Sequence, residues 1–292
     1  MLDAWIKETE AMIKAFGKDL TGDLERIGEN SVGHTVKTTN DALGANIITA
    51  GTLGQAKVIQ DMVEQTIINL QPSKGAPLSS LMRQITSKMG NDFELLIRDG
   101  YQNGKTIQQL IAETGEMLIG KGKTVQRNLE SLVRTSTSAI AQEARRKTWA
   151  QNSDLIEGVQ QISTFDSRTT VVCWARANKI WDLQGNPINH DIPYNGGPPL
   201  HYNCRSAEIS ILRRKLPKHL EDKIPASKRA TMYGLIDADV DPQEWLRKQP
   251  WAEETLGKTR YKLWMDGTIK DLSQLLDQSG NPLNIEKVVG YI

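Results

Sequence analysis

Aromatic residues and long apolar runs are both scarce in this sequence. Of its 292 residues only 5% are aromatic and 38% are hydrophobic, which is low for one tightly packed globule. We therefore expect an elongated or multi-lobed molecule. No run of about eighteen apolar residues occurs, so no transmembrane helix is predicted, and the first residues mix charges where a signal peptide has an apolar segment.

Cysteine and an excess of either charge are also lacking. Two cysteines are too few for a disulfide-rich secreted protein, which predicts that the chain is made and kept in a reducing cytoplasm. The 36 basic and 35 acidic residues nearly cancel. The net charge of the whole chain is therefore too small to attract nucleic acid or a membrane, and any such contact must come from a local patch of charged residues.

Apolar residues at helical spacing dominate the first half of the chain. The pattern predicts helices from Leu2 to Ile27, from Gly54 to Leu70 and from Thr124 to Gln151. The last of these is the longest uninterrupted candidate, and we expect it to be the central helix. Further helices are predicted near Ser79 and after Thr106, a residue type favoured at helix N-caps.

The spacing of apolar residues changes near residue 155, from the spacing of a helix to that of short strands. Val159–Phe165, Val171–Trp174 and Ser206–Leu212 have the composition and spacing of short strands. The sequence therefore predicts an α+β fold that is mostly helical, with a small antiparallel sheet over about residues 155–212 packed on the long central helix. Helices of the last part are predicted at 241–246, 253–265 and 269–276.

The tryptophans allow two interpretations. Trp174 and Trp181 are expected to lie in the core. Trp245, Trp251 and Trp264 could either complete that core or anchor an interface, where tryptophan is enriched at hot spots.

One cassette, residues 166–205, contains both cysteines and two of the four histidines. Cys173, His201 and Cys204 are residue types that zinc prefers, so a single zinc ion is the cofactor hypothesis. The alternative is that both cysteines are small buried hydrophobes facing each other across a hairpin, with His201 bonded to backbone.

A closed structural zinc site needs four ligands, and these residues supply three. The remaining candidates are water, Asp166, Asp191 and His190, and the sequence does not choose among them.

Charged residues at the two ends of the cassette form a second constellation. Asp166 and Arg168 share a face if their segment is extended, and Arg205 is expected to reach the same area. Bidentate pairing of arginine with a carboxylate can hold a loop in place. No order of serine, cysteine and histidine here has the geometry of a known triad, so we predict no catalysis.

A nuclease is one alternative. Asn189-His190-Asp191 followed by His201 faintly matches a metal-dependent His-Asn-His nuclease. That site needs a general-base histidine beside a metal ligand and further ligands on a downstream helix, whereas the downstream segment here is predicted as a strand.

The cassette reads D-S-R-T-T-V-V-C at 166–173 and P-P-L-H-Y-N-C-R-S at 198–206. These segments resemble D-x-R-T-C-x-x-C followed by P-P-x-H-x-N-C-R-C, the motif of the phage Mu protein F-like head-morphogenesis family, the minor head proteins. Thr170 and Ser206 replace two family cysteines, which removes half of the thiol ligands. The structural motif residues that the resemblance implies are Asp166, Arg168, Thr169, Pro199, Asn203 and Arg205.

The resemblance extends beyond the cassette and suggests a domain organisation. Arg134-Thr135 matches a family helix that precedes the cassette, and Asn103–Leu110 resembles the family's glycine turn and next helix. The predicted domains are an N-terminal helical region at 1–100, a Mu F-like domain at 101–212 and a C-terminal helical extension at 213–292.

The family resemblance implies a low-copy virion component near the portal that supports head assembly, genome packaging or ejection. Its location would be the head interior or the portal and neck region, and the host cytoplasm during assembly. Implied partners are the portal protein and capsid or scaffolding proteins, with no small-molecule substrate and no membrane in the mature virion. A toxin carried by a head-morphogenesis domain is a further alternative, although only about eighty residues follow the cassette, which is short for a catalytic domain.

Basic residues outnumber acidic ones around the predicted central helix. Such residues can contact the phosphates of packaged double-stranded DNA without sequence preference. The alternative is a solvated helix face balanced by acids elsewhere. The candidate phosphate contacts are Lys121, Lys123, Arg127, Arg145, Arg146 and Lys147.

Overall fold

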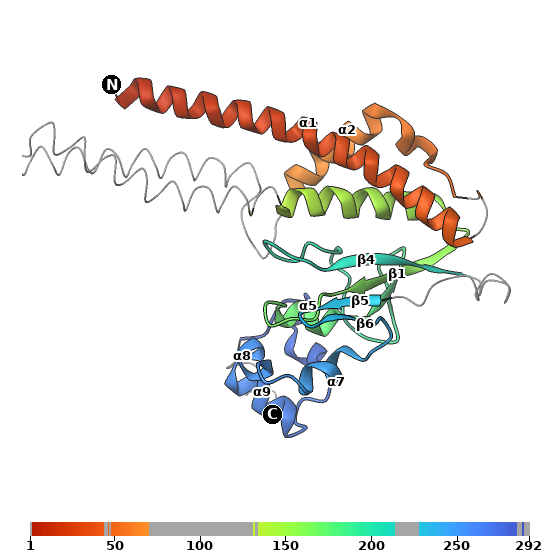
Figure 1. The fold of residues 1–292 in the computed structure, drawn as a ribbon, viewed down its shortest axis with the longest axis vertical. Helices are drawn as coiled ribbons and strands as arrows, with labels where there is room; N and C mark the ends of the chain where they lie inside the picture. The colour runs from red at the N-terminus through yellow and green to blue at the C-terminus, as the bar shows by residue number, and fades with distance from the viewer. Residues whose placement is uncertain are drawn as a thin grey trace, which may run out of the picture. The chain divides into compact units, whose positions relative to one another are not determined.

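The computed structural model describes residues 2–43, 46, 48–69, 131, 134–213, 228–284 and 288 (Figure 1). The predicted helices near Ser79 and after Thr106, and the segment Asn103–Leu110, lie outside these residues. So does the predicted domain boundary near residue 100, and the domain organisation stays a prediction.

Two of the predicted helices begin the chain. Helix α1 (Leu2–Leu43) is followed by the short 3-10 helix η1 (Gly51–Gly54) and by α2 (Ala56–Asn69). The apolar period predicted α1 only to Ile27. Beyond that point Val32, Thr35 and Thr39 keep helical spacing and are buried, so the inward stripe continues with hydroxyl side chains in it. Thr35 Oγ1 donates to the carbonyl of Ser31 at 2.6 Å, which satisfies this buried hydroxyl.

The chain divides into two compact units. The first comprises Met1–Asn30, Gly54–Glu143 and the short loop His201–Asn203. The second comprises Ser31–Leu53, Ala144–Leu200 and Cys204–Ile292.

Helices form the described core of the first unit. Gly28 of α1 lies against Ile59 and Met62 of α2 and against Ile140 of the helix over residues 134–151. Leu24, Ile59 and Ile140 are fully buried there, as the apolar stripe of each helix requires.

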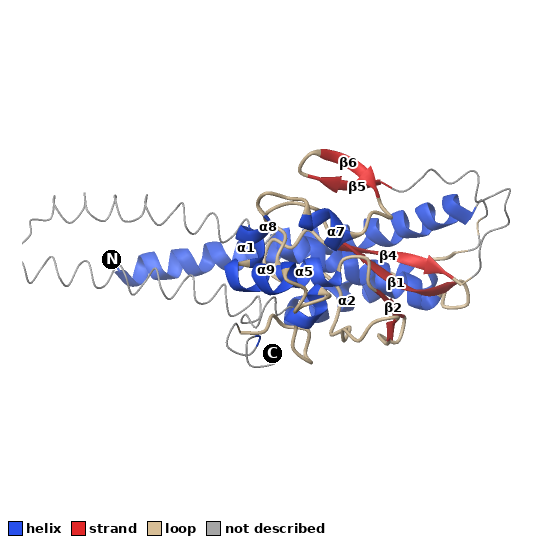
Figure 2. Cartoon of the chain, turned by 90° about the horizontal axis from the view of Figure 1, so that it is seen from below, coloured by secondary structure: helices blue, strands red, loops and turns tan. Residues whose placement is uncertain are grey.

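The second unit contains an antiparallel sheet with strand order β3-β2-β1-β4. The fold is therefore α+β, as predicted, and Figure 2 shows the strands among the helices. The strands near Val159 and Ser206 are confirmed. The four strands are β1 (Ile156–Ile162), β2 (Ile180–Asp182), β3 (Pro187–Ile188) and β4 (Ala207–Leu212).

The sheet packs on the end of the predicted central helix. Trp149 of that helix forms one hydrophobic cluster with Ile156 and Val159 of β1, Trp181 of β2 and Ile192. The helix is confirmed over its described part, residues 134–151.

The predicted strand at Val171–Trp174 is wrong. This segment forms the helix α5 (Val171–Arg176) after Thr170 in an extended conformation. The β-branched Val171 and Val172 favour a strand locally, but a helical turn buries Cys173 and Trp174, and tertiary packing overrides the local preference.

The C-terminal part is not wholly helical, which corrects the prediction for 213–292. A hairpin of β5 (Lys228–Thr231) and β6 (Gly234–Asp237) precedes the helices. The predicted helix at 253–265 is two helices, because Gly257 between them has a φ of 80°. The helical elements are α7 (Pro242–Arg247), α8 (Ala252–Leu256), α9 (Lys258–Met265) and the 3-10 helix η3 (Leu272–Leu275).

The five tryptophans of the cassette and the C-terminal part differ in their burial. Trp174 and Trp181 are fully buried, as expected, and so is Trp264. Trp245 and Trp251 are half-buried beside Trp174, with ring centroids 6.0 and 6.4 Å from it. Within the described ranges no helix has both the length and the apolar character needed to cross a bilayer.

Candidate functional site

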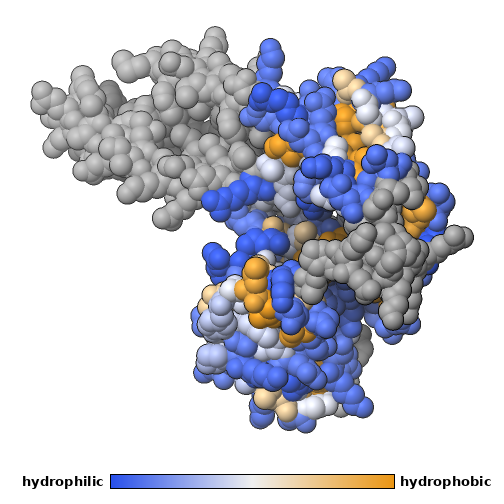
Figure 3. Space-filling view, turned by 45° about the vertical axis from the view of Figure 1, so that its right-hand side comes forward, coloured by the Kyte–Doolittle hydropathy of each residue, from blue (hydrophilic) through white to orange (hydrophobic). Residues whose placement is uncertain are grey.

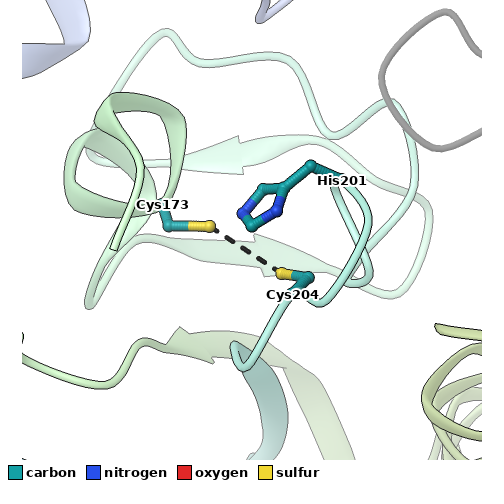
Figure 4. A group of neighbouring side chains, drawn as sticks. All are labelled: Cys173, His201 and Cys204. Atoms are coloured by element: carbon teal, nitrogen blue, oxygen red, sulfur yellow. Dashed lines mark hydrogen bonds between the residues drawn. The ribbon is translucent and has the colours of Figure 1, made fainter. Parts of the chain in front are cut away.

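The three predicted metal ligands converge. Cys173 comes from α5, Cys204 from the segment that leads into β4, and His201 from the turn just before it (Figure 4). Their ligand atoms all lie within 4.8 Å of one another, and both cysteines are buried while His201 is half-buried. This Cys-His-Cys group could hold a metal ion.

The separation of the two sulfur atoms suits a shared zinc ion. Cys173 Sγ lies 3.8 Å from Cys204 Sγ. Two Zn–S bonds of about 2.3 Å at a tetrahedral angle place their sulfurs about 3.8 Å apart. The two cysteines do not form a disulfide, which would bring the sulfurs to about 2.05 Å.

The ring of His201 is oriented by the backbone of the next residue. Its Nδ1 lies 2.9 Å from the carbonyl oxygen of Tyr202, and a carbonyl can only accept a hydrogen bond. The proton of a neutral ring is then on Nδ1, and Nε2 keeps the lone pair that a metal needs. The expected backbone bond is present and is compatible with ligation.

Protons must leave this group before a metal can bind. The hydrogen bond with Cys204, burial and the charge of Cys204 raise the pKa of the Cys173 thiol well above its usual value. The hydroxyl groups of Ser206 and Thr170 act in the opposite direction and lower this pKa. Thr170 and Ser206 therefore lie beside Cys173.

None of the three candidates for a fourth protein ligand joins the Cys-His-Cys group. Asp166 is bound by Arg205, and Asp191 is exposed. His190 uses both ring nitrogens: Nε2 lies 2.8 Å from the carbonyl of Ile180, and Nδ1 accepts the backbone N–H of Ile192 at 3.1 Å. In the part of the chain that the structure describes, the metal-ligand group is limited to three residues.

The two ends of the cassette are joined by an ion pair. Arg205 donates to both carboxylate oxygens of the buried Asp166, through Nη2 at 2.6 Å and through Nη1. Asp166 also accepts the backbone N–H of Arg168 at 2.9 Å and the hydroxyl of Thr169 at 3.3 Å. Burial raises the pKa of Asp166, but the Arg205 contact and these hydrogen bonds outweigh it and lower the pKa overall. The pairing expected from the sequence is present, although the segment is a turn and not extended.

Asn203 anchors the second half of the cassette to a helix. Its backbone N–H donates to Thr135 Oγ1 at 3.1 Å, and its side-chain amide donates to Ser131 Oγ at 2.9 Å. Asn203 has a φ of 56°, a conformation that asparagine tolerates. Sequence reasoning named Asn203 and Thr135 separately but did not pair them. The adjacent prediction, Pro199, follows a cis peptide bond and is half-buried.

Arg176 was missed as a structural residue of the cassette. It is buried at the end of α5 and donates to Gln161 Oε1 at 2.9 Å, to the carbonyl of Pro193 at 3.0 Å and to that of Gly196 at 3.2 Å. Its guanidinium lies 4.4 Å from the centroid of the Trp181 ring. Burial lowers the pKa of Arg176, but its usual value is so high that the group stays charged.

A buried carboxylate, Glu208 of β4, was also missed. Tyr194 donates to its Oε1 at 2.7 Å, and Arg146 Nε lies 4.0 Å from its Oε2. Gly197 faces the same carboxylate, and a Cβ at that position would lie less than 3.0 Å from it. No signal of this network is present in the sequence: residues 206–212 alternate polar and apolar types, yet Glu208 is 2% exposed and Ile209 is 43% exposed.

Half of the candidate DNA contacts can be placed. Lys121, Lys123 and Arg127 lie outside the described residues. The other three lie on the helix over residues 134–151, where each is half-buried.

Contacts within the protein involve Arg146, and burial affects Arg145. Arg146 lies beside Glu208 and 4.9 Å from the centroid of the Tyr194 ring, so it has a structural role within the protein. Burial lowers the pKa of Arg145.

Comparisons of the whole chain with protein-family models, curated proteins and solved structures found no match.

Proposed function

We propose that this chain is a phage minor head protein, present in few copies near the portal, that supports head assembly, genome packaging or ejection. One observation carries the proposal: the two distant halves of the cassette come together. Asp166 of the first half binds Arg205 of the second, and Cys173 meets Cys204. The residues that match the family motif therefore contact one another and hold the two halves of the cassette together.

The helix before the cassette adds support. The family resemblance includes an R-T helix, and Thr135 of that helix accepts the backbone N–H of Asn203 from the P-P-x-H-x-N-C-R segment. Three separated parts of the motif thus interact, which is what a motif maintained for architecture requires. The implied partners remain the portal protein, capsid or scaffolding proteins and packaged DNA.

The surroundings of His190 favour a non-enzymatic function over the nuclease alternative. A general base needs a ring nitrogen available to the attacking water, and both nitrogens of His190 are engaged with backbone groups. The segment after His201 is the strand β4, where the nuclease would place ligands on a helix.

We also propose that Cys173, His201 and Cys204 hold one zinc ion with a structural role. When bound, the ion would supply a cross-link between α5 and the segment before β4. The residues themselves contribute two buried thiols and an oriented imidazole. Water is the remaining candidate for the fourth position, because the protein groups considered for it are engaged or exposed.

The head-protein proposal is tested on purified particles of the phage whose genome encodes this chain. Quantitative mass spectrometry should detect the chain at far fewer copies than the major capsid protein. Deletion of its gene should lower the yield of filled, infectious heads, and the wild-type gene supplied in trans should restore it. Particles that lack the chain and form and infect normally would refute the proposal.

Elemental analysis of the purified chain tests the zinc site. We expect about one zinc per chain, lost in Cys204→Ser. Thr170→Cys is the matched gain-of-ligand variant: it adds a thiol beside Cys173, so its zinc should resist a chelator longer than that of the wild type. Less than about a tenth of an equivalent of zinc in the wild type, with Cys204→Ser still folded, would remove the metal hypothesis.

A further inference from the structure

The β5–β6 hairpin carries most of the large exposed apolar side chains of the described surface. In Figure 3 hydrophilic residues cover most of the visible face, and hydrophobic ones gather in a few places. Of the hairpin residues, Leu235 is 73% exposed, Tyr233 66% and Met232 48%. Exposed apolar clusters on an otherwise polar surface are typical of interaction sites.

The register of the hairpin explains why Leu235 faces solvent. Arg229 pairs with Ile236, and both turn inward: Arg229 is buried and Ile236 packs on the main hydrophobic cluster. Side chains alternate along a strand, so Leu235 and Asp237 point to the opposite, outer face. Leu235 is therefore not needed for the core of this chain.

The backbone of β6 presents an open edge at the same residue. The N–H of Phe165 donates to the carbonyl of Ala230 at 3.1 Å, and the carbonyl of Phe165 accepts the N–H of Met232 at 3.1 Å. The side of β5 that faces away from β6 is therefore occupied. Ala230 is opposite Leu235, and in this register the N–H and C=O of Leu235 point away from β5. Within the described residues the small sheet ends at β6, which lies on the outer side of the hairpin in Figure 2.

The charge next to this edge is acidic. From residue 232 to 246 the sequence has four acids and no lysine or arginine. Lys228 pairs with Asp237 across the hairpin. The acids are Asp237, Asp239, Asp241 and Glu244, and all four residues are exposed.

We propose that the outer edge of β6 is a docking site for an extended segment of another protein, which adds as a further strand. An open edge supplies main-chain hydrogen bonds, and the side chains beside it select the sequence. The partner segment carries an apolar residue next to Leu235 and a lysine or arginine next to Asp239, because Asp237 already pairs with Lys228. A second copy of this chain fits less well, because its own β6 segment offers no basic residue.

Peptide probes test the edge directly, without reference to any function of the chain. The probe is a fluorescent, end-capped eight-residue peptide in which valine alternates with lysine, and its binding to the full chain is followed by anisotropy. One control peptide has glutamate in place of lysine, and another has methylated nitrogens on alternate residues, which removes one edge of hydrogen bonds. Each should bind at least about tenfold more weakly than the probe.

Two variants of the chain complete the test. Leu235→Pro removes the outward N–H, which the hairpin ladder does not use, and should weaken probe binding at least about tenfold while circular dichroism stays unchanged. Leu235→Ala keeps the N–H and should weaken binding less. If Leu235→Pro unfolds the hairpin, the methylated peptide still tests whether binding needs the main-chain hydrogen bonds of an added strand.

Several results would overturn the proposal. Equal binding of the methylated peptide would show that no strand is added, and equal binding of the glutamate peptide would show that the acids select nothing. Absence of saturable binding would remove the site. A dimer of the chain that Leu235→Pro abolishes in sedimentation would make a second copy the occupant.

Discussion

Single residues decide how closely the cassette can pack. Gly197 faces the buried carboxylate of Glu208, which already accepts from Tyr194 and lies near Arg146. A carboxylate that is buried and bonded cannot swing away without losing its partners. In the sequence Gly197 stands in a Gly-Gly-Pro-Pro run typical of a turn, whereas the structure makes it a steric requirement.

Gly197→Ala should destabilise the fold by about 1–3 kcal/mol, because its Cβ would overlap the Glu208 carboxylate. Thermal unfolding followed by circular dichroism measures the change. Glu208→Ala removes the obstructing group, so the cost of the Gly197 substitution should largely vanish in the double variant. Equal costs in the two backgrounds would mean that the carboxylate is not the obstacle.

At the scale of elements, local sequence decides where α7 begins. Asp241 is its N-cap, and its Oδ1 accepts the backbone N–H groups of Gln243 at 2.9 Å and Glu244 at 2.7 Å. Pro242 follows at the first helical position, where its missing N–H costs nothing. This signal is readable without any tertiary contact, and the predicted helix at 241–246 matches α7.

Asp241→Ala should lower the free energy of unfolding by about 1 kcal/mol, because two N–H groups of the first turn lose their acceptor. Asp239→Ala is the matched control, since it removes a nearby exposed carboxylate that caps no helix. Urea denaturation of both variants compares them. If Asp239→Ala lowers the free energy of unfolding as much as Asp241→Ala does, the effect comes from the lost charge and not from the lost cap.

Elements without such local signals were misassigned. The hairpin β5–β6 was missed because its strands are short and its turn, Met232-Tyr233, lacks the usual turn residues. Val171 and Val172 indicated a strand where α5 forms. In both cases the deciding contacts come from residues far away in the chain, such as Phe165, which bonds to β5.

For the whole molecule, paired carboxylates set the response to acid. The pKa of Asp166 is lowered as described, and that of Asp271 is lowered because bonds from Ser273 and the charge of Lys179 outweigh its burial. A carboxylate with a lowered folded pKa stabilises the protein above its unfolded pKa, about 3.9, and this contribution is lost as pH falls through the folded value.

The free energy of unfolding should therefore decline below about pH 4. In Asp166→Asn the uncharged amide cannot titrate, so the variant should be less stable at pH 6 and should lose less stability between pH 5 and pH 3. Urea denaturation at these pH values measures both effects. A variant that keeps the full wild-type pH dependence would show that the Asp166 ion pair contributes nothing to acid sensitivity.

The sequence by itself determined the α+β class, the helical beginning, the strands near Val159 and Ser206, and the cassette as the place of interest, because periodicity and residue type are local properties. Only the tertiary structure decided that Asp166 binds Arg205, that the Cys-His-Cys group forms without Asp191 or His190, and that β6 is the outer strand of its small sheet within the described residues. Those outcomes depend on side chains brought together from distant positions, and on burial that no local pattern records.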